Sequence, residues 1–313
     1  MDKALEIYKR LKQSDTVVHI KEAVRRDGEY SKAYPIGYDV FDKAILGGVR
    51  EGDLIIGTGI SGHGKTLAFQ NITVNLSKAG HSCLWFSYEV IIDNLYAKFR
   101  SMGIDTDSLL LYAPKQNTSG ALDWLQEKIK ESYDKYHTKF VFIDHIDYLT
   151  PKKVRSTDQL RMILSNVCAE LKTMAISMNI IIFLIAHVKK VQGRAIEMQD
   201  IGESSGIFKL ADLILGVTRN SSIQRRNGQK YEVYEKISTL RTLKNRISGD
   251  QAIMDFIVEN NIIIPLKEEI TNNPPVKYYN ETEKDYEIEI VDNAIQAYNV
   301  DVKEGELQNA LFK

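Results

Sequence analysis

The sequence predicts an α/β fold in which a mostly parallel central sheet is flanked by helices and carries antiparallel edge strands. From Leu54 to Thr218, short apolar runs alternate with segments of helical periodicity, the pattern of buried parallel strands joined by covering helices. The first apolar run ends in the glycine-rich stretch "GTGISGHGKT", residues 57–66. A flexible loop therefore follows a strand at the sheet edge where open α/β folds bind ligands.

The core elements are expected in a regular order. Strands are expected where apolar residues stand together, and helices where apolar residues recur every three or four positions. The first strand is expected to begin at Leu54, because a stretch rich in glycine and proline precedes it. The expected strands are Leu54–Gly57, Ser82–Ser87, Leu109–Tyr112, Phe140–Ile143, Ile180–Ala186 and Leu213–Thr218, and the expected helices are Thr66–Lys78, Ile92–Met102, Ala121–Ser132 and Thr157–Met178.

The segments outside this core differ from it in pattern. After the last parallel strand, "YEVYEKISTLRTLKN" and "QAIMDFIVENNIII" predict antiparallel strands added at one edge of the sheet. Residues 1–30 have apolar positions at helical spacing, which indicates two short amphipathic helices. From Glu268 onward the chain is rich in charge and contains "NNPP", so a loosely ordered tail is expected.

Composition limits the classes of protein. With 313 residues, 43% of them hydrophobic, the chain can bury a sizeable core. The net charge is −1, but residues 267–313 hold 11 acidic and 5 basic residues, and the remainder holds 31 acidic and 36 basic ones. A mildly basic body with an acidic tail permits a local phosphate-binding surface without requiring one.

The sequence indicates a cytoplasmic protein. The longest apolar run, "NIIIFLIA" (Asn179–Ala186), is too short to span a bilayer, and the N-terminus carries charges where a signal peptide is apolar. Cys83 and Cys168 lie 85 residues apart in apolar segments, without the spacing of a metal site. Two buried, reduced thiols are expected.

The glycine-rich stretch has the spacing of a phosphate-binding loop. Gly59 to Thr66 fit the pattern G-x-x-x-x-G-K-T between an expected strand and an expected helix. Glycines let backbone N–H groups turn toward phosphate oxygens, and the helix adds its positive end. Lys65 would bridge the β- and γ-phosphates of ATP, and Thr66 would bind Mg²⁺. The expected nucleotide-binding residues here are Gly59, Ser61, Gly62, His63, Gly64, Lys65, Thr66 and Leu67; the alternative is a glycine-rich turn with an incidental lysine.

Two carboxylates at strand ends complete the expected site. Asp144 follows the apolar run Phe140–Ile143 and would hold Mg²⁺ through water. Asp147 is the weaker candidate, because it lies beyond the strand and can simply cap the turn. Glu89 ends the next strand after the loop and would take a proton from the water that attacks the γ-phosphate; the alternative is a solvated glutamate at a strand end.

Together these motifs resemble the RecA-like P-loop NTPase superfamily, and specifically the motor domain of DnaB-type hexameric replicative helicases. The resemblance rests on "PIGYDVFDKAILGGVREGDLIIGTGISGHGKT", "FS-x-E", "FIDHIDYL", "MQDIGESSGIFKLADLILGVTR" and "LKNRISG", and it runs from about Tyr34 to Pro265. It implies an ATP-dependent DNA helicase that uses ATP and Mg²⁺ and works as a homo-oligomer, commonly a hexameric ring on single-stranded DNA.

The resemblance also implies roles for four further residues. His187 stands where the family carries a γ-phosphate sensor, and Arg219 resembles a residue near the nucleotide base. Lys244 and Arg246 resemble a basic finger that enters the neighbouring subunit's site. The catalytic set is then Lys65, Glu89, Asp144, His187, Lys244 and Arg246. The alternatives are a hydrogen-bonded histidine at a strand end and two ordinary surface cations.

Two basic loops are candidates for nucleic-acid contact. Lys152, Lys153 and Arg155 follow the Asp144 strand, and Lys189, Lys190 and Arg194 follow the next one, so both loops leave the same sheet edge and fit a groove for a single-strand backbone. The alternative is two solvated loops. The resemblance adds a DNA-contacting loop with Glu203, Ser204, Ser205 and Gly206, although Gly202 stands where the family has an arginine and Ser205 replaces a glycine.

The expected organisation has three parts. Residues 1–33 form a helical linker or oligomerisation segment, residues 34–266 form the RecA-like motor, and residues 267–313 form an acidic extension. Ahead of the motor the family usually carries a collar domain that contacts primase, and only the short segment stands there in this sequence; a primase or a loader remains a possible partner. Two other functions stay open: a RadA- or RecA-like recombination or repair ATPase, whose "KNR" run matches Lys244 to Arg246, and a KaiC-like regulatory ATPase that acts on protein partners.

Overall fold

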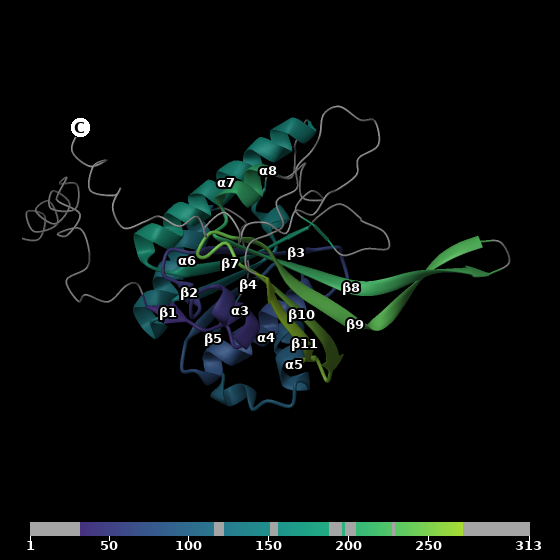
Figure 1. Ribbon diagram of the computed structural model, residues 1–313. Helices are drawn as coiled ribbons and strands as arrows, with labels where there is room; N and C mark the ends of the chain where they lie inside the picture. Colours follow the sequence, from purple (N-terminus) through teal and green to yellow (C-terminus); the bar gives the residue numbers. More distant parts are fainter. Residues whose placement is uncertain are drawn as a thin grey trace, which may run out of the picture.

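A nine-stranded sheet forms the centre of the part of the chain that the computed structural model describes, namely residues 32–115, 122–150, 156–187, 196–197, 205–226 and 229–271. The strand order is β11-β10-β9-β8-β3-β7-β6-β4-β5 (Figure 1). The strands from β8 to β5 in this order run parallel to one another: β3 (Leu54–Gly59), β4 (Cys83–Ser87), β5 (Leu111–Tyr112), β6 (Phe140–Asp144), β7 (Ile181–His187) and β8 (Leu213–Arg226). The antiparallel edge consists of β9 (Gln229–Asn245), β10 (Gln251–Glu259) and β11 (Ile262–Thr271). The predicted fold class is confirmed.

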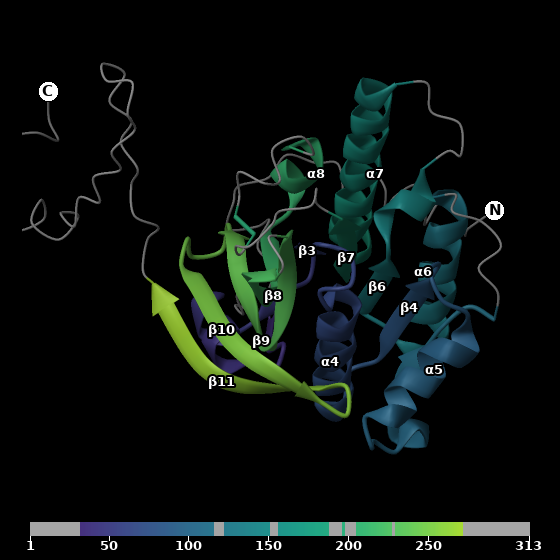
Figure 2. The ribbon, with the colours of Figure 1, turned by 90° about the vertical axis from the view of Figure 1, so that its right-hand side faces the viewer.

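Helices cover both faces of the sheet, as Figure 2 shows. One face carries α3 (Asp39–Ala44), α4 (Lys65–Lys78) and α5 (Ile92–Ser101), and the other carries α6 (Leu122–Tyr136), α7 (Thr157–Met178) and α8 (Ser205–Leu210). Successive strand residues point to opposite faces, so Phe183 packs on Phe69 of α4 while Leu184 packs toward α7. Apolar residues on both sides of each strand explain the continuous apolar runs.

Short elements precede and connect the core. Strands β1 (Ala33–Tyr34) and β2 (Val49–Arg50) pair antiparallel ahead of β3, so the expectation that the first strand begins at Leu54 is wrong. Two-residue strands are too short to produce a periodic pattern. A Cβ atom at Gly48 would lie 2.2 Å from the Tyr34 carbonyl, which explains the glycine at this close approach. Two 3₁₀ helices, η1 (Thr106–Ser108) and η2 (Ile146–Leu149), complete the connections.

The antiparallel edge extends beyond its expected limits. Strand β8 continues past Thr218 to Arg226 and pairs with β9 from Gln229 onward, whereas β9 pairs with β10 only over Ser238–Arg241. The outer parts of β8 and β9 therefore project from the sheet as a two-stranded ribbon (Figure 1). Strand β11 also continues beyond residue 266, because its pairing with β10 extends to Gln251 opposite Thr271.

Both cysteines are buried and free, as the sequence predicted. Burial raises the pKa of the Cys168 thiol to about 12 and also raises that of Cys83, so neither thiol ionises at neutral pH. None of the described helices combines the length and the apolar character that a membrane span requires.

Candidate active site

The carboxyl ends of four parallel strands surround a cavity of about 280 Å³. Strand β3 leads into the glycine-rich loop, and β4, β6 and β7 end beside it. The cavity brings together residues that are far apart in the sequence, as expected for the edge where open α/β sheets bind ligands. Its lining is Ser61, Gly62, Gly64, Lys65, Thr66, Leu67, Gln70, Glu89, Val90, Lys98, Asp144, Ile185, His187 and Asn261.

The loop between β3 and α4 has a conformation that depends on glycine. Gly64 precedes α4 with a φ of 99°, a left-handed conformation that residues with a side chain rarely adopt. At Gly59, a Cβ atom would lie 2.6 Å from the Val217 carbonyl oxygen of β8. The loop thus lies against the neighbouring strand while the amino end of α4 faces the cavity, an arrangement that suits an anion.

Lys65 lies buried at the floor of this cavity. Its Nζ donates a hydrogen bond to the Ile60 carbonyl oxygen at 3.0 Å. Burial lowers the pKa of Lys65 to about 8, against the opposing effect of Asp144 and Glu89. The ammonium group is therefore under-solvated, and a polyphosphate would supply the negative charge that it lacks.

Thr66 and Asp144 form the metal-type corner of the cavity. The Thr66 hydroxyl donates to Asp144 Oδ2 at 3.0 Å, and Asp144 Oδ1 is buried with no hydrogen-bond partner among the described residues. Burial raises the pKa of Asp144. Mg²⁺ prefers oxygen ligands, so the Thr66 hydroxyl and the Asp144 carboxylate are suited to hold this ion.

Glu89 and His187 face the same cavity from two other strands. Glu89 is exposed in the turn after β4, where the Ser87 hydroxyl donates to the Val90 carbonyl at 2.7 Å and Tyr88 N donates to the Asp144 carbonyl at 2.9 Å. His187 ends β7 and is half-buried. Burial, and secondarily Lys65, lowers the pKa of His187, so its imidazole is neutral at neutral pH.

His63, in the loop, and Arg219, on β8, both lie outside the cavity lining. The buried His63 ring accepts a hydrogen bond at Nδ1 from Arg219 N at 3.1 Å and meets the Tyr234 ring edge-on. The Arg219 guanidinium lies 5.0 Å from the centre of the same tyrosine ring. These contacts fasten the loop to the β8–β9 ribbon.

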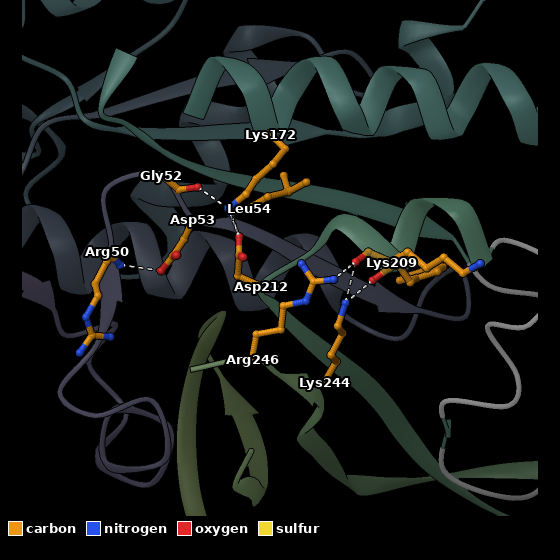
Figure 3. A network of polar contacts seen from close by, with 10 residues as sticks. Arg50, Gly52, Asp53, Leu54, Lys172, Lys209, Asp212, Lys244 and Arg246 are labelled. Carbon is orange, nitrogen blue, oxygen red and sulfur yellow. Dashed lines mark hydrogen bonds and ion pairs between the residues drawn. The ribbon is translucent and has the colours of Figure 1, made fainter. Parts of the chain in front are cut away.

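Lys244 and Arg246 lie away from the cavity, at the other end of the sheet. Lys244 pairs with Ile214 at the start of β8, whereas the cavity opens at the carboxyl ends of the parallel strands. Lys244 Nζ donates to the Phe208 and Lys209 carbonyls at 2.8 and 2.9 Å, and Arg246 Nη2 donates to the Lys209 carbonyl (Figure 3). Both cations therefore contact the carboxyl end of α8, where the helix dipole favours positive charge.

Three polar residues of the lining were not indicated by the sequence pattern. Gln70 lies one turn after Thr66 on α4, and its buried Nε2 has no partner among the described residues. Lys98 comes from α5, and Asn261 comes from the turn between β10 and β11, where its carbonyl accepts from Asn71 Nδ2 at 3.0 Å. The four-residue spacing from Thr66 could have indicated Gln70, whereas only the tertiary fold brings Asn261 here.

Most of the residues predicted to contact DNA lie outside the described part of the chain. These are Lys152, Lys153, Arg155, Lys189, Lys190, Arg194, Glu203 and Ser204. Ser205 and Gly206 form the first turn of α8. Their predicted role therefore stays a prediction.

A family model described as "ATPase: KaiC" matches residues 34–225, more than half of the chain and the whole of the loop, both strand-end carboxylates and His187. The chain belongs to the KaiC family of ATPases. Nucleotide binding, typically with Mg²⁺, and ATP hydrolysis are the properties of this RecA-like class, and the cavity has residues suited to both.

Curated relatives agree with this assignment. The DNA repair protein RadA of Bacillus subtilis (strain 168) is 25% identical over 150 residues, which are 48% of this chain and 31% of that protein. The RecA protein of Mannheimia haemolytica is 29% identical over 112 residues, 36% of this chain and 28% of that protein. The match with RadA thus spans about a third of that relative.

Two solved structures share the fold at low sequence identity. One of them, described as an ATPase domain, has a TM-score of 0.61 at 15% identity and covers 85% of this chain and 98% of that one. A DnaB-like replicative helicase, described with its primase interactions, has the same TM-score and identity and covers 85% of this chain and 72% of that one. The RecA-like fold and the resemblance to DnaB-type motor domains are confirmed.

Proposed function

We propose that this KaiC-family ATPase is a DnaB-type DNA helicase motor, which hydrolyses ATP at the subunit interfaces of a ring and unwinds duplex DNA during replication. The observation that carries the proposal is the position of Lys244 and Arg246. Both belong to the basic finger that the resemblance implies. The cavity opens at the carboxyl ends of the parallel strands, whereas both residues lie near the amino end of β8. A second copy of the chain would supply them to that cavity.

Within one subunit, the proposed roles follow from the lining. Lys65 and the amides of the glycine-rich loop would bind the β- and γ-phosphates, with Thr66 and Asp144 holding Mg²⁺. Bound Mg²⁺ would neutralise charge that develops on the phosphates. Glu89 reaches the cavity from a solvent-exposed turn and would accept the proton of the attacking water. His187, neutral at neutral pH, would donate one hydrogen bond to a γ-phosphate oxygen.

The finger residues would act in the neighbouring subunit. An arginine that reaches the γ-phosphate in trans stabilises transition-state charge and contributes about 10³-fold or more in rate. Arg246 is exposed in the turn after β9 and has the fork of donors that suits this role, whereas Lys244 is half-buried at the end of that strand. We assign the main contribution to Arg246 and a supporting one to Lys244.

The remaining parts of the chain complete the proposed motor. The basic loops at 152–155 and 189–194, with residues 203–206, would contact the phosphates of single-stranded DNA in the ring's channel. Residues 1–33 would link adjacent subunits, and residues 267–313 would form an acidic extension outside the motor. A primase or a loader is a proposed partner.

A RadA- or RecA-like repair or recombination ATPase is the second candidate. The curated relatives favour it, because RadA and RecA proteins match parts of this chain at 24–32% identity. Such a protein would assemble on DNA and hydrolyse ATP without robust unwinding. A KaiC-like regulatory ATPase would instead be indifferent to DNA.

Unwinding of a forked DNA substrate tests the proposal. We expect ATP-dependent strand separation by the full chain, and none by Glu89→Gln, which should still bind ATP. A wild-type chain that hydrolyses ATP in response to single-stranded DNA but fails to unwind forks at any salt concentration would refute the helicase assignment. Branch migration or strand pairing in that case would select the RadA- or RecA-like function.

A further inference from the structure

Three metal-type donors gather beside the nucleotide cavity. His145 and Asp147 follow β6, His187 ends the neighbouring strand β7, and one donor atom from each lies within 4.8 Å of the other two. His145 Nδ1 is 3.2 Å from Asp147 Oδ2, and the two imidazole rings lie 4.4 Å apart between centres at 81° to one another. The parallel pairing of β6 with β7 brings these residues to one edge of the sheet.

The chemistry of this group differs from that of the Mg²⁺ corner. Two imidazoles and one carboxylate are the donors of zinc-type divalent ions, whereas Mg²⁺ prefers oxygen ligands alone. Bonds from zinc to these donors are about 2.0–2.2 Å long, so two ligands of one ion lie about 3–4 Å apart. The three donors therefore need to draw together by only about an ångström.

The surroundings permit that contraction. The His145 side chain is buried, and its Nδ1 accepts only a long hydrogen bond, from Asp147 N at 3.4 Å, which an ion bound at this nitrogen would replace. The Asp147 side chain is 52% exposed, so its carboxylate can rotate toward an ion and solvent can reach the site. Lys65 repels a cation here, and the carboxylates of Asp147 and Glu89 oppose that repulsion.

We propose that His145, Asp147 and His187 bind one divalent transition-metal ion of the zinc type, with water in the remaining coordination position. This site is separate from the Thr66–Asp144 corner, because neither His145 nor Asp147 lines the nucleotide cavity. His187 at the end of β7 and the buried His145 directly after β6 lie near each other before the ion arrives, which reduces the ordering that binding requires.

The site shares one residue with the proposed nucleotide chemistry. His187 lines the nucleotide cavity and is also a donor of the proposed metal site. The His187 nitrogen that binds the ion cannot also donate to a γ-phosphate, so the ion and ATP exclude one another at His187 when both use the nitrogen that faces the cavity. This consequence rests on the proposed function, whereas metal binding itself does not.

Titration of the untagged, nucleotide-free full chain with Co²⁺ after removal of metals tests the site directly. We expect one equivalent to bind with a visible ligand-field band that Zn²⁺ abolishes. Asp147→Asn, His145→Asn and His187→Asn should each weaken binding at least about tenfold. The matched control is His137→Asn, because His137 is exposed after α6 with a φ of 54° that asparagine tolerates. It should bind Co²⁺ like the wild type.

The outcome that overturns the proposal is absence of stoichiometric binding, or binding that Asp147→Asn and His145→Asn leave unchanged. Asp147→Asn keeps the test valid if His145→Asn fails to fold, because Asp147 is on the surface. A second experiment adds saturating Mg²⁺ with either ADP or a non-hydrolysable ATP analogue to the Co²⁺-loaded chain. The analogue should diminish the band several-fold more than ADP does; equal bands would refute the exclusion at His187 and leave the metal site standing.

Discussion

At the scale of single residues, burial disfavours both charges on the cavity floor. It raises the pKa of Asp144 and lowers that of Lys65 to about 8. Each group is therefore stabilised by a ligand of opposite charge: Asp144 by a cation and Lys65 by a polyphosphate. In the free chain, the burial of these two charges is unfavourable. Bound Mg²⁺ and nucleotide phosphates would offset that free energy.

Asp144→Asn should separate metal binding from folding. Since burial raises the pKa of Asp144, its charged form destabilises the fold above that pKa, and a neutral amide should leave the melting temperature unchanged or higher. Affinity for an ATP analogue should fall at least about tenfold with Mg²⁺ and little in EDTA. Calorimetry measures the melting temperature of the variant, and titration with the ATP analogue measures its affinity. Asp107→Asn, on the surface, is the control; a large loss of stability in Asp144→Asn would contradict the account.

The Lys65 shift predicts a pH dependence of nucleotide binding. Phosphates favour the ammonium form, so binding raises the pKa of Lys65 above its free value of about 8. Affinity should then be constant below pH 7 and decline as pH rises through 8, by about tenfold at pH 9. Equilibrium titration with an ATP analogue at each pH measures it. Lys65→Met should bind weakly and without this dependence, and an equally steep decline in that variant would assign the titration to another group.

At the scale of elements, the turn between β9 and β10 is built around one side chain. Asn245 Nδ2 donates to the Ala44 carbonyl at 2.8 Å and to the Asp250 carbonyl at 3.0 Å, while its Oδ1 accepts from Ile247 N at 2.9 Å. These bonds span Arg246 and join the turn to α3. Arg246 N also donates to the Asp212 carbonyl at 2.9 Å, and Lys172 on α7 donates to Asp212 Oδ2 at 2.6 Å. A polar network therefore holds the finger, and Figure 3 shows the part of it around Asp212 and Arg246.

Asn245→Ala should loosen the finger while leaving the chain's own cavity intact. Loss of the side-chain bonds should cost about 1–3 kcal/mol of unfolding free energy, measured by urea titration. ATP turnover should fall more than tenfold, whereas the dissociation constant of nucleotide should stay within about twofold. Ser248→Ala keeps the hydrogen bonds that Ile247 N and Ser248 N donate to Asn245 Oδ1, so it should lose less of each. Equal losses of binding and turnover would contradict the role of this turn.

The sequence predicted the parallel core well because each strand there is buried on both faces and produces a continuous apolar run. It predicted most of β9 but underestimated β8, whose outer part "RNSSIQRR" is mostly polar and shows no apolar alternation. It placed Lys65, Thr66, Asp144, Glu89 and His187 in one site, because strand ends meet at one sheet edge. It did not find Asn261, which reaches the cavity only through the pairing of β10 with β11.

At the scale of the whole molecule, each subunit holds two separated halves of the proposed catalytic machinery. The cavity opens at the carboxyl ends of the parallel strands, and Lys244 and Arg246 contact α8 at the opposite end. A ring that places the finger of one copy at the cavity of the next would join the halves. Oligomer assembly and hydrolysis would then depend on one another.

Mixing of two inactive variants should restore activity. Lys65→Ala should lack nucleotide binding, and Arg246→Ala should bind nucleotide without hydrolysing it. In mixed rings, some interfaces pair an intact cavity with an intact finger, so ATP turnover should reappear. If subunits pair at random and interfaces act independently, turnover should reach at most about a quarter of the wild-type rate. Turnover across mixing ratios measures this. Lys65→Ala mixed with Lys65→Ala,Arg246→Ala is the control; absence of rescue at every ratio would exclude action in trans.

The rate of ATP hydrolysis with and without single-stranded DNA, at low and physiological salt, shows whether the chain is a DNA-driven motor. It should be measured for the wild type and for Glu89→Gln. We expect a basal rate that DNA stimulates strongly, more so at low salt because phosphate contacts dominate, and almost no turnover in the variant under any condition. A rate that DNA leaves unchanged, or one that Glu89→Gln retains, would contradict a DNA-driven motor with its catalytic base at Glu89.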